Sequence, residues 1–546
     1  MCGKFNWKCS FRVVYKEVVH LISYLVCGFA GQGDLGEDMI GRVQKRQFKS
    51  PPLSHLHSSF VPPPGYEAKA ITEMESNLMD LEDYARMVQK KLQQHRAVMS
   101  PVRRLPPEIL GEIFSRASCA QGHGMRLPFC YDMPWVLGEV CSYWRTVLLS
   151  LPKLWSEIYL DLRQLWDPQD DNTHPDIVAR RVDKVRDFLE TCLTRSGNEL
   201  LRFFISARSK RFIDPILSTL VKHAERWAEA QINVNCLSQC HPHLIRAKNR
   251  VPNLYCLGIE CYFKEHAPPS SPCDAFENAP KLETLLMEGM TYPMNMFPVP
   301  WSQVAYLQLS YCQVRKDQFR QILHSATNLI SLLAEGGHRQ EMPGDTGQML
   351  PAVLPNLQYL SMVGTSGYIA EICKSLTVPN LQHFGIKALT PFPVHDTISM
   401  ITRSQCKPTE LTFHTSLDPS AKWERFGIAE LFNELPSLTF LDLIVSNATK
   451  DLIPNFWYDD CNFDEFEPPL LPNLEKLVLE DRLCSSIKTV LETMLTRSRD
   501  NTRSPEGWTR LKSATLRIAV EDPTLSLWAK AKENGIDIVV PEIPVK

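Results

Sequence analysis

The chain has 546 residues and a formal net charge of −3, because 59 lysines and arginines stand against 62 aspartates and glutamates. Apolar residues make up 44% and charged residues 22%, which excludes a wholly disordered or collagen-like chain. Phosphate-backbone binding depends on clustered positive charge, so nucleic acid is not expected as a partner. The 40 prolines outnumber the 24 glycines, which predicts rigid punctuation rather than flexible linkers. The 17 cysteines form no short-spaced framework, which indicates reduced and mostly buried thiols.

Residues 1–65 are expected to form a poorly ordered tail. The apolar run 18–30 is shorter than the about 20 residues that a spanning helix needs, so no membrane association is expected. A secretory signal peptide is the alternative interpretation of this run, although Glu17 borders it. We expect a cytoplasmic or nuclear location. The glycines at 31, 33 and 36 lack the following helix and acidic residue of a dinucleotide site, so no cofactor is predicted.

Residues 66–100 are predicted to form one long helix with a heptad seam. Apolar positions alternate in steps of three and four residues over four heptads, and Pro101 ends the pattern. The seam consists of Ile71, Met74, Leu78, Leu81, Ala85, Val88, Leu92 and His95. Two outcomes remain open: self-association through residues 71–95 as a coiled coil, or packing of the helix on its own protein.

Residues 101–160 contain three apolar motifs in a fixed order. The first is a helical pattern around Pro106, with apolar residues at 105, 109, 110, 113 and 114. The second is a helix expected from Trp135 to Leu151, and the third is a strand-like run that begins near Lys153. A box of about 50 residues is too small to hide so many large apolar groups by itself, so some of them are expected to face a neighbour.

These three motifs resemble the F-box-like domain that is common in fungal proteins. The resemblance implies a small helical bundle that binds a Skp-type adaptor, and through it a cullin. The adaptor-binding residues that it implies are Leu105, Pro106, Ile109, Leu110, Ile113, Phe114, Val140, Cys141 and Trp144. The insertion at 119–134 departs from a minimal box. The alternative is a bundle that only caps the following domain.

Residues 161–546 repeat a motif of apolar, two residues, apolar, one residue, apolar. Between residues 200 and 511, most successive copies start 22 to 30 residues apart, which is typical of leucine-rich repeats. Helical patterns lie between the copies, so each period predicts one strand and one helix. Prolines stand two residues before the first leucine of several copies: Pro252, Pro280, Pro355, Pro379, Pro436 and Pro472.

The expected fold class is therefore α/β, with the heptad helix, the F-box-like bundle and then a curved leucine-rich-repeat solenoid. Such degenerate repeats are common in the fungal F-box family. The strand positions that would point into the concave face are Glu260, Glu288, Ser310, Glu335, Lys387, His414, Asp442, Glu480 and Arg517. We consider two interpretations of this face: a binding surface for a basic segment of a target protein, or a solvated polar surface.

Motifs for catalysis and metal binding are weak. Cys236, Cys240, His241 and His243 lack the two spaced ligand pairs of a zinc site, and the acidic run 459–467 lacks the turn glycine of a calcium loop. No hydrolase elbow, phosphate loop or zinc-protease motif occurs in the chain. We therefore expect a non-catalytic substrate-recognition subunit of an SCF-type, cullin-RING ubiquitin ligase, without metal or cofactor. The alternatives are a scaffold that uses the same solenoid without a ligase, and a secreted binder.

Overall fold

The chain is a mixed α/β protein built on a large parallel sheet. The computed structural model describes residues 66–98, 105–119, 125–127, 134–163, 175–235, 237–261, 272–290, 297–312, 314, 316–336, 351–389, 392–415, 430–445, 471–481, 494–495, 509, 511–518, 529–530, 532–534 and 536–539. The expected tail at 1–65 and the acidic run at 459–467 lie outside these residues. The chain divides into two compact units, Met1–Glu157 with Cys192–Gly197 and Ile158–Thr191 with Asn198–Lys546. The division falls close to the boundary expected near residue 160.

The first unit begins, in its described part, with the long helix α3 (Tyr66–Val98), as the heptad pattern predicts. Three further helices follow: α4 (Pro107–Cys119), α5 (Trp135–Val140) and α6 (Ser142–Leu149). The short strand β1 (Met125–Leu127) and the 3-10 turn η3 (Pro152–Trp155) complete the unit. Most of the insertion at 119–134 lies outside the described residues.

One expected helix, Trp135 to Leu151, is in fact two helices. Cys141 between α5 and α6 is extended, with φ −165° and ψ 168°, and its sulfur accepts a hydrogen bond from the Trp144 amide at 3.4 Å. An N-cap of this kind satisfies an amide at the start of a helix, which explains why α6 begins anew at this point. The helical spacing of apolar residues continued through the break and concealed it.

The second unit contains strands that pair side by side in chain order, all of the registered pairs being parallel. They are β2 (Glu157–Asp161), β3 (Leu201–Ala207), β4 (Trp227–Val234), β5 (Cys256–Cys261), β6 (Thr284–Glu288), β7 (Tyr306–Ser310), β8 (Ser331–Glu335), β10 (Tyr359–Gly364), β12 (His383–Ala388), β13 (Glu410–Thr415), β14 (Phe440–Val445), β15 (Lys476–Asp481), β16 (Ser513–Ile518) and β17 (Ile536–Val539). A strand forms at every predicted copy of the apolar motif, and β17 was not predicted.

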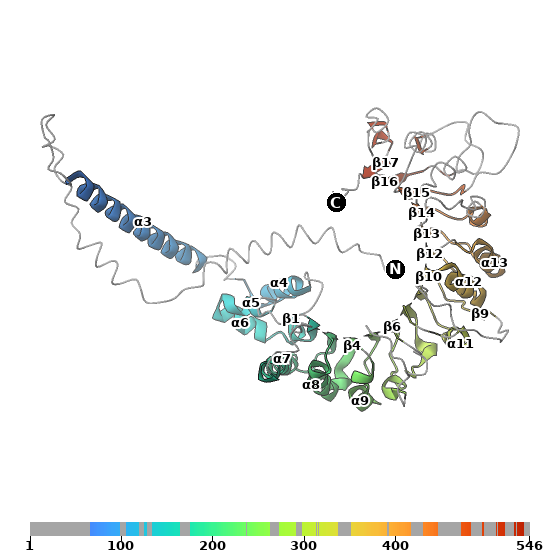
Figure 1. The fold of residues 1–546 in the computed structure, drawn as a ribbon, viewed down its shortest axis with the longest axis horizontal. Helices are drawn as coiled ribbons and strands as arrows, with labels where there is room; N and C mark the ends of the chain where they lie inside the picture. Colours follow the sequence, from blue (N-terminus) through green and yellow to red (C-terminus); the bar gives the residue numbers. More distant parts are fainter. Residues whose placement is uncertain are drawn as a thin grey trace. The chain divides into compact units, whose positions relative to one another are not determined.

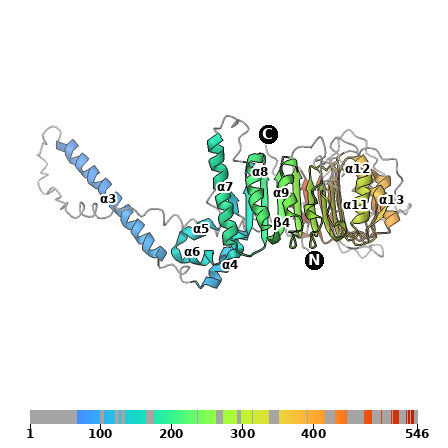
Figure 2. The ribbon, with the colours of Figure 1, turned by 90° about the horizontal axis from the view of Figure 1, so that it is seen from below.

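Helices connect many of these strands, since a parallel pair requires a long crossover. They are α7 (Pro175–Arg195), α8 (Lys210–Leu220), α9 (His241–Leu244), α11 (Lys316–Ser325), α12 (Ser366–Ser375) and α13 (Val394–Ser404). Figures 1 and 2 show α8, α9, α11, α12 and α13 on one side of the sheet. A separate two-stranded sheet pairs β9 (Ala352–Val353) with β11 (Leu376–Thr377). We call the face of the large sheet that is turned away from these helices the inner face.

The core of the second unit lies between the sheet and these helices. The apolar triplets of the repeats supply it: Leu254, Leu257 and Ile259 are at most 2% exposed, and Leu357, Leu360 and Met362 are fully buried. Alternate residues of a strand point to opposite faces, so burial of the triplets turns the intervening side chains to the inner face. The predicted burial of the repeat motif is confirmed.

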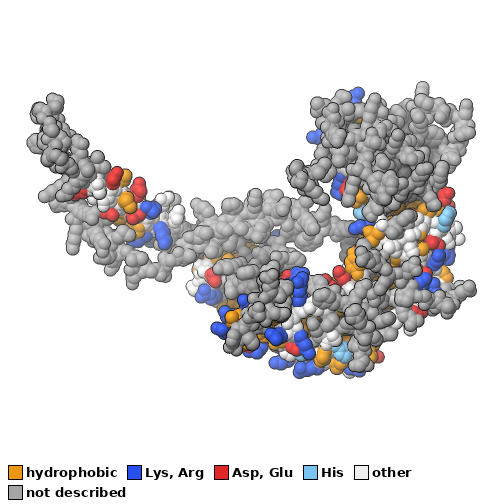
Figure 3. All heavy atoms as spheres, viewed as in Figure 1, with side chains coloured by type: hydrophobic (Ala, Val, Ile, Leu, Met, Phe, Trp, Pro, Cys, Tyr) orange, Lys and Arg blue, Asp and Glu red, His pale blue; other side chains and the backbone are white. Residues whose placement is uncertain are grey.

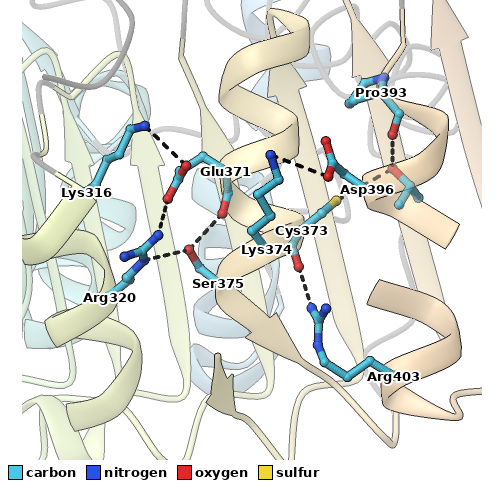
Figure 4. Close-up of polar contacts among 10 residues, drawn as sticks. Lys316, Arg320, Glu371, Cys373, Lys374, Ser375, Pro393, Asp396 and Arg403 are labelled. Carbon is cyan, nitrogen blue, oxygen red and sulfur yellow. Dashed lines mark hydrogen bonds and ion pairs between the residues drawn. The ribbon is translucent and has the colours of Figure 1, made fainter. Parts of the chain in front are cut away.

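Polar contacts join neighbouring crossover helices, as Figure 4 shows. Glu371 on α12 lies 2.6 Å from the Arg320 guanidinium and 3.3 Å from the Lys316 ammonium, both on α11. On the other side of α12, the Arg403 guanidinium of α13 donates to the Cys373 carbonyl at 2.6 Å. Glu371 is only 9% exposed, and two cations compensate the cost of burying its charge.

Asparagines in the Pro-Asn-Leu motifs join successive repeats on their exposed edge. The Asn380 amide donates to the Pro355 carbonyl at 2.7 Å, and the Asn473 amide donates to the Pro436 carbonyl at 2.9 Å. Asn253 makes the equivalent bond to the Glu225 carbonyl at 3.0 Å. Each acceptor is the residue one repeat earlier at the proline position. The proline ends the preceding segment, and the asparagine after it fastens one turn of the chain to the turn before it.

Candidate functional site

The helix α4 has two apolar sides with different environments. Leu110 and Phe114 are fully buried, and the Phe114 ring lies 5.0 Å from the Trp144 ring between centroids. Ile109 and Ile113 lie one position earlier along the helix and are 50% and 39% exposed. Residues four apart share one side of a helix, so each pair forms its own stripe. One stripe builds the core of the unit and the other remains on its surface.

The nine residues assigned to adaptor binding therefore divide into two groups. Leu110, Phe114, Val140 and Trp144 are at most 5% exposed, and we correct their assignment: they support the bundle and present no surface to a partner. Cys141 is half-buried and caps α6. The exposed members are Pro106, Ile109 and Ile113, with half-buried Leu105 beside them.

The structure adds Tyr143 to this surface. Its side chain is 36% exposed, and its hydroxyl donates to the Leu105 carbonyl at 2.9 Å, so α6 lies beside the start of α4. The sequence pattern missed this residue because Tyr143 lies off the apolar stripe of α6. We define Pro106, Ile109, Ile113 and Tyr143 as the α4 surface. Its exposed isoleucines are the kind of apolar groups that a protein interface buries.

The second candidate surface is the inner face of the sheet. Strand register brings eight of the nine predicted residues into one row: Glu260 pairs with Glu288, Glu288 with Ser310, and Ser310 with Glu335. Through Val363 and Ile444 the same row continues to Lys387, His414, Glu480 and Arg517. Asp442 lies two residues before Ile444 and thus belongs to the adjacent row of the same face. The nine positions therefore lie on one face of the sheet.

Charges are unevenly balanced along this row. Near its C-terminal half, the Asp442 carboxylate of the adjacent row is 3.7 Å from the His414 ring, and within the row the Glu480 carboxylate is 4.0 Å from the Arg517 guanidinium. Among the described residues, no lysine, arginine or histidine forms an ion pair with Glu260, Glu288 or Glu335. Glu335 instead accepts a hydrogen bond from the Tyr311 hydroxyl, which raises the pKa of that phenol to about 12. We call Glu260, Glu288 and Glu335 the acidic row.

Two carboxyl groups of the acidic row, those of Glu260 and Glu288, have a pKa above the ordinary value of a glutamate. Partial burial, followed by the charge of Glu288, raises the pKa of the Glu260 carboxyl above its ordinary value. Partial burial, followed by the charge of Glu335, raises the pKa of Glu288 in the same direction. Asn233 and the Arg163 charge oppose the shift at Glu260. A positively charged group placed on this row would favour the ionised carboxylates. It would therefore offset the cost of their partial burial and of their mutual repulsion.

A pocket with a volume of about 150 Å³ opens on the inner face at the start of the acidic row. Its polar lining includes Gln231, Asn233, Glu260, Glu288 and Gln308, and its apolar lining includes Phe204 and Leu286. Gly258 lines the pocket, and it leaves the space between its neighbours open because glycine has no side chain. A Cβ atom on Gly258 would lie 3.1 Å from Cγ of Gln231. The pocket combines apolar walls with two carboxylates, which suits the stem and charged head of a basic side chain.

Cys240 and His243 of the weak zinc pattern make contacts within the described fold. The Cys240 thiol donates to the Leu237 carbonyl at 3.3 Å, and the His243 ring is 3.0 Å from the Asp214 carboxylate. Cys236, the first residue of the weak zinc pattern, lies outside the described residues. Within the described part of the chain, no three His, Cys, Asp or Glu side chains are grouped so that they could hold a metal ion. Burial raises the pKa of the Cys373 thiol to about 12, so this sulfur stays protonated at neutral pH.

No model of a known protein family matches the sequence, and no curated protein matches it. Among the described helices, none is both long and apolar enough to cross a membrane.

Proposed function

We propose that the chain is a substrate-recognition subunit of an SCF-type, cullin-RING ubiquitin ligase. The first unit would be an F-box-like bundle that binds a Skp-type adaptor through the α4 surface. The second unit would be a leucine-rich-repeat solenoid that binds the target protein, and no catalytic residue would be needed. A cytoplasmic or nuclear location is part of this proposal.

The main support for the proposal is the double-sided helix α4. Its buried stripe holds a small bundle together without help from Ile109 and Ile113, which leaves those two side chains exposed at 50% and 39%. Removing exposed isoleucine side chains from water against an apolar partner is favourable, because water makes no comparable interaction with them. An adaptor protein with an apolar groove would bury them.

The inner face supports the second half of the proposal. The acidic row presents carboxylates beside a pocket, and partial burial together with the charge of a neighbouring carboxylate raises the pKa of Glu260 and of Glu288. A lysine or arginine from the target would lower the cost of ionising these carboxyl groups as it bound. We therefore expect targets with an extended basic segment. Reversing Glu260, Glu288 and Glu335 to lysine tests this: an unchanged set of captured proteins would rule out recognition through the acidic row.

Co-purification of a Skp-type adaptor with the full chain tests the first half. We expect the native chain to retain the adaptor and Ile109→Asp plus Ile113→Asp to lose it. Leu149→Asp is the matched control, because Leu149 is 44% exposed in the same unit but lies on α6, outside the α4 surface. A native chain that retains no adaptor would refute the ligase and leave the scaffold function. Localisation of a chain that starts at residue 66 would separately test the secreted alternative.

A further inference from the structure

The helix α3 exposes an apolar seam that nothing in the proposed function uses. Leu78, Leu81, Val88 and Leu92 are 57%, 41%, 43% and 49% exposed. With Ala85 between Leu81 and Val88, they recur in alternating steps of three and four residues, the spacing that fits a second helix. The outer positions of the helix are mostly polar or charged, so the exposed apolar groups form a stripe and not a scatter. A stripe of this kind indicates a helical partner.

Charge is segregated along the same helix. Between residues 72 and 95, every acidic residue precedes every basic one. The acidic residues are Glu73, Glu75, Asp80, Glu82 and Asp83, and the basic residues are Arg86, Lys90 and Lys91. Figure 3 shows the acidic side chains of α3 towards its start and the basic ones towards its end. The helix is thus acidic in its first half and basic in its second.

This charge pattern selects one orientation for a pair of identical helices. Paired helices lie about 8–10 Å apart, which is close to the Debye length at physiological ionic strength, so their charges still interact. A parallel pair would place acidic halves together and basic halves together. An antiparallel pair places each acidic half beside a basic half, and it also opposes the two helix dipoles.

The small residue of the seam favours the same orientation. In a parallel pair, Ala85 would face Ala85 of the second copy and leave a gap at that layer. In an antiparallel pair centred between residues 81 and 85, Ala85 faces Leu81 of the second copy, and Leu78 faces Val88. Large side chains then fill the space beside the small one, as close packing requires.

We propose that α3 forms an antiparallel coiled coil with α3 of a second copy of this chain. The chains would leave the pair at opposite ends of a rod about 50 Å long, since 33 helical residues rise about 1.5 Å each. Two copies of the binding units would then be held apart on one assembly. This proposal is independent of the ligase function, because it uses no residue of the α4 surface or the inner face.

The oligomeric state of the full chain tests the pairing. We expect a mass of twice 62.4 kDa by sedimentation equilibrium at micromolar concentration. Leu78→Asp should give the mass of one chain. Met79→Asp should leave the dimer intact, because Met79 is 66% exposed but lies off the seam. A native chain that is monomeric, or equal behaviour of the two variants, would overturn the proposal.

The orientation is tested by the sign of two electrostatic effects. In an antiparallel pair, Glu73→Gln plus Glu75→Gln removes attraction to the basic half of the second copy, so the dissociation constant should rise roughly fivefold. Added salt should weaken the native dimer for the same reason. A parallel pair would respond in the opposite direction to both changes, because it would lose repulsion. Tighter association in either experiment would therefore refute the antiparallel arrangement.

Discussion

Shortening a side chain of the buried stripe of α4 should destabilise the first unit much more than shortening one of the exposed stripe. Leu110 is fully buried, and removing a buried leucine side chain costs about 2.7–5 kcal/mol. A bundle of this size has only about 3–5 kcal/mol to lose, so Leu110→Ala should leave it largely unfolded at 25 °C. Ile109 is 50% exposed, so Ile109→Ala should cost less than about 1 kcal/mol.

Hydrogen exchange followed by mass spectrometry measures this locally within the full chain. Peptides from α4 and α6 should exchange about a hundredfold faster or more in Leu110→Ala, and near the native rate in Ile109→Ala. Adaptor binding should weaken in both variants, but Leu110→Met should preserve it because the volume of the core is conserved. Equal acceleration of exchange by Ile109→Ala and Leu110→Ala would refute the division of α4 into a core stripe and a surface stripe.

Three further outcomes follow from the second unit. Asn380→Ala should lower the free energy of unfolding in denaturant by about 1 kcal/mol, since it removes the hydrogen bond to the Pro355 carbonyl. The control is Asn356→Ala, in another Pro-Asn-Leu motif, where the asparagine makes no such bond among the described residues. Equal losses in the two variants would contradict the role of the asparagine. Glu288→Gln should raise the melting temperature at pH 7, because the raised pKa of this carboxyl makes its ionisation a cost to the folded state. The gain should shrink as pH falls through the raised pKa and vanish below the ordinary value of 4.5; a gain that persists at pH 3 would contradict the electrostatic cause. Cys373 should stay unmodified by iodoacetamide in the folded chain at pH 7.5, and rapid labelling measured by mass spectrometry would contradict its burial.

The strands of the second unit other than β17 were predictable because their apolar triplets have a fixed internal spacing. Leu357, Leu360 and Met362 show the logic: burial of these three fixes the face on which the residues between them lie. The position of Glu260 beside Glu288 then followed from equal offsets in successive repeats. Contacts that depend on particular side chains did not follow. The bonds from Asn253 and Asn380 to the preceding repeat require the geometry of the turn, although the repeated Pro-Asn-Leu motif was the signal for them.

The α4 surface shows where periodicity alone is ambiguous. Ile109, Leu110, Ile113 and Phe114 form two overlapping stripes of similar hydrophobicity, and spacing cannot decide which one the bundle buries. The partners decide it: Trp144 packs on Phe114, which makes that stripe the core. The pocket near Gly258 was also beyond the sequence, because it arises from a missing side chain between Gln231 and Leu286 on neighbouring strands.

The affinity of the purified chain for a Skp-type adaptor tests the proposed function most directly. Titration calorimetry with the native chain should give a dissociation constant in the micromolar range or below, with Leu149→Asp unchanged. Ile109→Asp plus Ile113→Asp should weaken binding by at least about tenfold, because two carboxylates would replace the apolar contacts. No measurable binding by the native chain, or equal binding by the α4 variant, would contradict the assignment of the first unit as an adaptor-binding box.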